Sequence, residues 1–248
     1  MRHYFRILCL GVLILTSLLS VLAYAENSFK KNNPDGYKYE FARSYIGALK
    51  YFYNVNQRWI KNPPKKKFKG DDFKTIRGSI EYLVQDNWDL RVAKNYMVRY
   101  LYSPNSLMRK VSDMLIDSCE KDIALNNKAK NLWQDWLNLK SAGRFKPKDE
   151  KNFIAAQRDI ELKRKESDKN VVEASILMSK VLLSQDNPND KGKLLVINEK
   201  ERNKLIDDLD SYGKEVMDWG LKPGQSTFSA SIAVIREVLE DPVFITHK

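Results

Sequence analysis

The sequence predicts an all-α protein, an elongated helical bundle built around a long antiparallel helical hairpin. Apolar residues recur every three or four positions along most of the chain, which is the spacing of one helix face. No segment shows the strict apolar–polar alternation of a half-buried strand. A short segment of turn residues separates two helical stretches of equal length, which favours two helices folded back on each other.

The hairpin is expected at residues 104–142 and 147–185. Ser103 suits an N-cap, and the proline after it suits the first helical position, where a missing N–H costs nothing. Gly143 suits the residue just past a helix end, and Pro147 suits the start of the next helix. Each arm holds 39 residues, which corresponds to about 58 Å of helix.

Shorter helices are expected on both sides of the hairpin. Their predicted positions are residues 37–60, 71–101 and 198–219, with a last short helix that ends before Asp241. Polar residues interrupt the apolar pattern at 86–89 and at 163–170. A kinked helix and two separate helices are both open at the first interruption, and a break is an alternative at the second.

The first 25 residues have the form of a secretory signal peptide. Two arginines, Arg2 and Arg6, precede an apolar run that ends at Ala23-Tyr24-Ala25, a small-residue cleavage signal. The prediction is therefore cleavage after Ala25 and an exported, periplasmic or extracellular product. The alternative is an uncleaved N-terminal anchor, although the apolar run is short for a membrane span.

The domain prediction follows from these segments. Residues 26–36 are polar and are expected to form a flexible lead. Residues 37–248 are expected to form one helical domain, or two small bundles that share the long helices.

Cysteine and histidine usage excludes several function classes. After the leader the chain keeps one cysteine, Cys119, and one histidine, His247. An intramolecular disulfide, a Cys/His zinc site and a haem attachment motif all need more of these residues. A catalytic triad would need a histidine from the end of the chain. No catalytic residue, metal or cofactor is predicted, and the protein is not expected to be an enzyme.

The net charge of +11 favours anionic surroundings. Lysines concentrate in the proline-stiffened loop between the first two helices, and the candidate anion-binding residues there are Lys65, Lys66, Lys67 and Lys69. Such lysines attract anionic membranes or polymers. The plain alternative is a solvated loop that only connects two helices. No specific nucleic-acid partner is indicated, because the chain lacks a recognisable nucleic-acid-binding fold.

Polar residues halfway along the hairpin form a second candidate site. In an antiparallel hairpin that turns near residue 145, facing residues have numbers that add up to about 290. This rule pairs Asp122 with Asp168 and Asn126 with Arg164. A polar bundle centre can hold a ligand cavity or a buried ion pair. The alternative is that these four residues face solvent.

Three functions remain after these exclusions. The first is a non-enzymatic bundle in the cell envelope that binds a ligand or a protein partner. The second is a structural or adaptor protein attached to an anionic membrane or polymer through a basic surface. The weakest is a hydrolase that uses carboxylates alone, because no spacing identifies the two carboxylates that such chemistry needs.

Overall fold

The structure, a computed structural model, describes residues 36–61, 73–103, 105–183, 197–217 and 227–241. The chain divides into two units. The first comprises Met1–Glu40 and Gln185–Ile197, of which only 36–40 and Ile197 are described. The second comprises Phe41–Ser184 and Asn198–Lys248, and all packing below concerns this unit. The leader, the lead before residue 36 and the lysine-rich loop lie outside the described residues, and the domain assignment stays a prediction.

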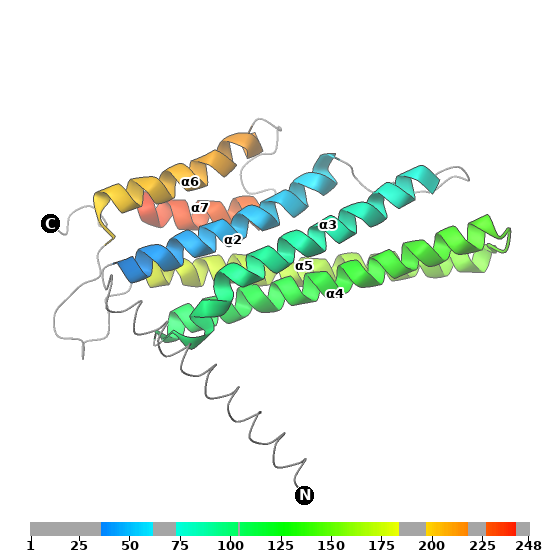
Figure 1. Cartoon of the computed structure of the whole chain (residues 1–248), viewed down its shortest axis with the longest axis horizontal. Helices are drawn as coiled ribbons and strands as arrows, with labels where there is room; N and C mark the ends of the chain where they lie inside the picture. The colour runs from blue at the N-terminus through cyan, green and yellow to red at the C-terminus, as the bar shows by residue number, and fades with distance from the viewer. Residues whose placement is uncertain (1–35, 62–72, 104, 184–196, 218–226, 242–248) are drawn as a thin grey trace, which may run out of the picture. The chain divides into compact units, whose positions relative to one another are not determined.

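The described residues form six α-helices and one 3-10 turn, and they contain no strand, which confirms the all-α prediction (Figure 1). The elements are α2 (Gly36–Lys61), α3 (Phe73–Val98), η1 (Arg99–Tyr102), α4 (Ser106–Ser141), α5 (Pro147–Leu183), α6 (Glu199–Met217) and α7 (Thr227–Glu240). No helix in this part of the chain has both the length and the hydropathy of a membrane span.

Helices α4 and α5 form the predicted hairpin, and they run antiparallel side by side (Figure 1). Gly143 follows the end of α4 with a φ of +64°, a left-handed conformation that glycine adopts without a steric cost. Pro147 is the first residue of α5, as expected. Helix α5 is continuous to Leu183, so the alternative of a break near residue 170 is wrong.

The start of the hairpin needs a correction. Helix α4 begins at Ser106, and its N-cap is Asn105 rather than Ser103. The Asn105 Oδ1 accepts hydrogen bonds from the backbone N–H groups of Leu107 and Met108, at 2.9 and 3.1 Å. The Ser103 hydroxyl instead accepts the N–H of Asn105 at 3.2 Å. Asn and Ser cap helices about equally well, so the residue types alone do not show whether Ser103 or Asn105 is the N-cap.

Helix α3 runs without interruption through residues 86–89, so the alternative of two separate helices is wrong. Three of those four residues, Asp86, Asn87 and Asp89, are buried. The apolar pattern is therefore interrupted because α3 turns polar residues toward the bundle interior. This finding places a polar layer where an apolar stripe would be expected.

Side chains from α3, α4 and α5 form an apolar cluster on one side of this layer. Its buried members are Ile76, Leu83, Leu125, Ala129, Trp133, Trp136, Leu137, Phe153 and Ile160. The two tryptophans of α4, Trp133 and Trp136, are only 5% and 4% exposed. On the other side, the Tyr45 hydroxyl of α2 lies 2.8 Å from Ser175 Oγ of α5.

The last two helices pack on each other, and α7 packs on α5. Helix α6 begins with a capping box, in which Glu201 N–H donates to Asn198 Oδ1 and Asn198 N–H donates to Glu201 Oε2. An ion pair between Arg236 and Asp210 joins α7 to α6 at 2.6 Å.

Candidate functional site

A layer of buried polar side chains joins the C-terminal part of α2 to the middle of α3, α4 and α5. We call it the polar layer, and its members are Arg58, Asp86, Asn87, Asp89, Asn126 and Arg164. Four of them are less than a tenth exposed: Asp86, Asn87, Asp89 and Asn126. Buried polar groups are costly without partners, so their hydrogen bonds decide the alignment of these helices.

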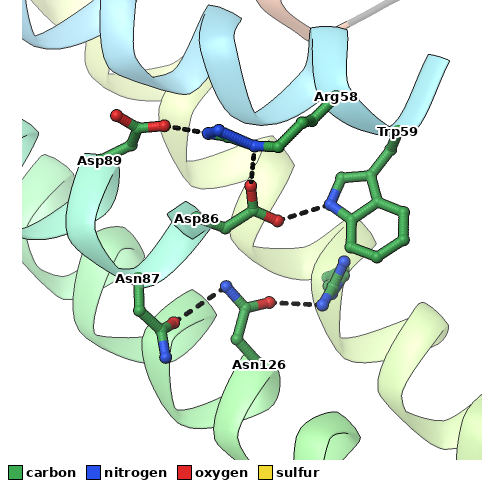
Figure 2. Close-up of polar contacts among 7 residues, drawn as sticks. Arg58, Trp59, Asp86, Asn87, Asp89 and Asn126 are labelled. Atoms are coloured by element: carbon green, nitrogen blue, oxygen red, sulfur yellow. Dashed lines mark hydrogen bonds and ion pairs between the residues drawn. The ribbon is translucent and has the colours of Figure 1, made fainter. Parts of the chain in front are cut away.

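Arg58 binds two carboxylates of α3 at once (Figure 2). Its Nε donates to Asp86 Oδ1 at 2.9 Å, and its Nη2 donates to Asp89 Oδ2. The planar guanidinium suits this arrangement, because its N–H groups point in fixed directions. The second oxygen of Asp86 accepts the indole N–H of Trp59 at 2.5 Å.

A second chain of hydrogen bonds links α3, α4 and α5. Asn126 Nδ2 donates a hydrogen bond to Asn87 Oδ1 (Figure 2), and the two atoms are 3.0 Å apart. Asn126 Oδ1 accepts from Nη2 of Arg164. Both the nitrogen and the oxygen of the Asn126 amide are therefore hydrogen-bonded, and this residue of α4 links α3 to α5.

Burial raises the pKa of several carboxyl groups in this region, Asp89 among them. Desolvation raises the pKa of Asp86 to about 6, although the Trp59 hydrogen bond and the Arg58 charge oppose the shift. Desolvation and the charge of Asp168 raise the pKa of Asp122 to about 7, against the effects of Ser167 and Arg164. Burial also raises the pKa of Asp168. Asp122 is therefore partly protonated near neutral pH.

A pocket of about 150 Å³ adjoins the polar layer and shares Arg164 with it. Its apolar wall comes from all four helices and comprises Trp59, Leu83, Ala129, Leu132, Trp133 and Ile160. The two tryptophan rings meet edge to face, with centroids 6.1 Å apart. Gln157, Glu161 and Arg164 of α5 add polar groups. The pocket thus has an aromatic body and one cationic group.

Two donors at this pocket have no acceptor among the described residues. They are Nε1 of Trp133 and Nε of Arg164, and both atoms are shielded from solvent. A buried N–H without an acceptor costs about 1–3 kcal/mol. A bound molecule with an oxygen acceptor would remove that cost, so the pocket is suited to bind such a molecule.

The structure places the predicted cavity residues as follows. Asn126 and Arg164 are brought together by their hydrogen bond, in the register expected for the hairpin. Asp122 and Asp168 are near enough for one charge to raise the pKa of the other carboxyl. Of these four residues only Arg164 lines the pocket. The loop residues Lys65, Lys66, Lys67 and Lys69 lie outside the described residues.

Sequence reasoning missed the contribution of α2 and α3 to this site. None of Arg58, Trp59, Asp86, Asn87 and Asp89 was a candidate site residue. The available signal was polar residues at inward positions of α3, between Leu83 and Leu90. Polar residues at core positions commonly mark a functional or alignment role.

Comparison of the chain with known proteins gives no relative from which the role of this site could be inferred. No protein-family model matches the chain, and no curated protein or solved structure matches it. Among the described residues, no group of three or more His, Cys, Asp or Glu side chains could hold a metal ion.

Proposed function

We propose that this chain is an exported, non-catalytic helical-bundle protein that binds a small amphipathic ligand in the pocket beside the polar layer. The observation that carries the proposal is the pair of unpartnered donors, Trp133 Nε1 and Arg164 Nε, at a pocket with two tryptophan rings. Export rests on the signal-peptide pattern of the first 25 residues.

The pocket volume limits the size of the buried part of the ligand. A cavity of this volume in another protein holds one benzene molecule, so about 150 Å³ accommodates a six-membered ring or a short alkyl chain. The edge-to-face tryptophans offer ring faces and edges against which such a group packs.

The donors indicate the polar part of the ligand. Arg164 has a neutral acceptor in Asn126, and no carboxylate of the described residues forms an ion pair with it. The nearby carboxylates are either paired or have a raised pKa: Arg58 pairs with Asp86 and Asp89, and the pKa of Asp122 is raised to about 7. The charge of Asp168 also interacts with Arg164, although burial raises the pKa of that carboxyl. Glu161 is exposed, so water screens its charge. A carboxylate suits Arg164 best, because arginine binds planar anions through two parallel N–H groups.

The test uses three probes of equal ring size: benzoate, benzamide and toluene. Binding is measured by titration calorimetry and by the shift in melting temperature. We expect benzoate to bind more tightly than benzamide and benzamide more tightly than toluene. Absence of binding by all three at millimolar concentration would contradict the proposal.

Matched variants locate the binding. Ala129→Leu should fill the pocket and abolish binding of all three probes, whereas Ala155→Leu, on an exposed position of α5, should leave it unchanged. Trp133→Phe keeps a ring and removes the N–H, so benzoate affinity should fall about fivefold to tenfold and toluene affinity should hold. Equal losses for Ala129→Leu and Ala155→Leu would place the binding elsewhere.

A further inference from the structure

An exposed row of aromatic rings runs along the junction of α2 and α3, away from the pocket residues. Trp88 and Tyr96 of α3 are 55% and 40% exposed, and Val84, one turn before Trp88, is 54% exposed. The Tyr51 ring of α2 lies 6.4 Å from that of Trp88 and 5.9 Å from that of Tyr96. The rings therefore form one continuous row across two helices rather than isolated exposed residues.

Gly47 of α2 makes room for this row. A Cβ atom at that position would lie 3.0 Å from Cε1 of Tyr96, which is tighter than nine in ten Cβ contacts in proteins. The absence of a side chain therefore lets the Tyr96 ring lie directly against the backbone of α2. This contact holds Tyr96 across the helix junction while 40% of it stays exposed.

The charges around the row are mostly positive. Arg77, Val84 and Arg91 are seven residues apart and therefore share one face of α3. Glu81 lies between the first two on that face, and Trp88 lies between the last two. In residues 41–59 and 73–98 the exposed basic side chains are Arg43, Lys50, Lys74, Arg77 and Arg91, and the exposed acidic side chain is Glu81. Neither Asp86 nor Asp89 offsets this excess, because both are buried and paired with Arg58.

We infer that this aromatic–basic face, formed by Tyr51, Val84, Trp88, Tyr96, Lys50, Arg77 and Arg91, docks on an anionic phospholipid surface. Tryptophan and tyrosine concentrate at the headgroup level of membranes, where a ring is buried and its polar atom stays wet. Basic residues near an anionic leaflet each strengthen attachment about fivefold. Both features occur here on one face, and the inference is independent of the pocket.

The test is co-sedimentation of the full chain with phosphatidylcholine vesicles that contain about one-third phosphatidylglycerol, beside pure phosphatidylcholine vesicles. We expect binding to the anionic vesicles that weakens as salt rises, since salt screens charges beyond about 10 Å at 0.1 M. Equal binding to both vesicle types, or none at low salt, would overturn the inference. Binding to soluble polyglutamate without binding to vesicles would also overturn it and favour an acidic protein partner.

Two double variants with the same change in net charge test whether the vesicles bind at this face. Arg77→Gln with Arg91→Gln should weaken binding to anionic vesicles by about 30-fold, from about fivefold per residue. Arg144→Gln with Arg158→Gln, at exposed positions of the hairpin, should leave it unchanged. Equal losses in the two pairs would overturn the assignment to this face. All four arginines are exposed, so circular dichroism should show that both variants fold.

The aromatic row is tested separately. Trp88→Ala should reduce binding to anionic vesicles at low salt, and the indole fluorescence of the parent should shift to shorter wavelength when vesicles are added. Unchanged affinity after Trp88→Ala, with an unshifted spectrum of the parent, would remove the aromatic part of the proposal. Because Trp88 is 55% exposed, its loss should leave the fold intact.

Discussion

The indole N–H of Trp59 donates to Asp86 Oδ2 at 2.5 Å and so joins the C-terminal part of α2 to the middle of α3. The same tryptophan lines the pocket, while Asp86 belongs to the polar layer. The shape of the pocket and the stability of the buried carboxylate are therefore coupled through one hydrogen bond. Substitutions in and around the polar layer should therefore change the free energy of unfolding of the bundle in measurable ways.

Loss of Arg58 should destabilise the bundle strongly. Arg58→Met leaves the Asp86 carboxylate buried without its cation, which typically costs about 3–5 kcal/mol. The loss should be smaller at pH 5 than at pH 8, because the raised pKa of Asp86 lets it take up a proton. Urea denaturation at both pH values measures this. Arg91→Met, at an exposed site, is the control, and an equal loss in both variants would refute the assigned role.

Asp122 should make the protein less stable as pH rises. Its pKa is 3.8 for the ordinary group and about 7 in the fold, so the folded state binds more protons between these values. The free energy of unfolding should therefore decrease from about pH 4 to pH 7. Asp122→Asn should remove much of this slope and stabilise the protein at pH 8 by about 1–2 kcal/mol. An unchanged slope in Asp122→Asn would disprove the prediction.

The turn of the hairpin offers a matched pair of glycine substitutions. Gly143 has a φ of +64°, and Gly78 lies inside α3; a Cβ at either position would meet open space. Gly143→Ala should cost about 1 kcal/mol through backbone strain alone. Gly78→Ala should stabilise by about 0.5–1 kcal/mol, because alanine favours a helix interior. Thermal unfolding measures both, and shifts of the same sign would contradict this explanation.

The export prediction concerns the first 25 residues. Cleavage after Ala25 should leave Glu26 as the N-terminal residue of the exported product. Intact-mass measurement of that product tests the prediction directly. A mass that includes the leader would support the alternative of a retained N-terminal anchor.

The lysine-rich loop can be tested in the same vesicle experiment as the aromatic–basic face. Changing Lys65, Lys66, Lys67 and Lys69 to glutamine should weaken vesicle binding if the loop contacts anionic lipid. Folding should change little if these lysines are solvated, because solvated charges contribute little to stability. Unchanged binding at low salt would leave the loop as a solvated connection between α2 and α3.

The hairpin could be predicted from sequence because its signals are local. Gly143 and Pro147 determine where one helix ends and the next begins, whatever packs against them. The antiparallel register then follows from counting, and it brought Asn126 opposite Arg164. The partners of α3 could not be predicted in this way. The contact of Asp86 with Arg58 depends on how two helices pack, and 28 residues separate the pair along the chain.

The polar layer also limits how the lengths of the hairpin arms can change. One helical turn is about 5.4 Å, so deleting a turn from α5 between its start and Arg164 would carry that residue out of reach of Asn126. Removing one turn from each arm, on both sides of Gly143, would keep the two residues level. Insertions and deletions near the tip should therefore be tolerated only when both arms change by the same length. The hydrogen bond between Asn126 and Arg164 then keeps the same register between α4 and α5.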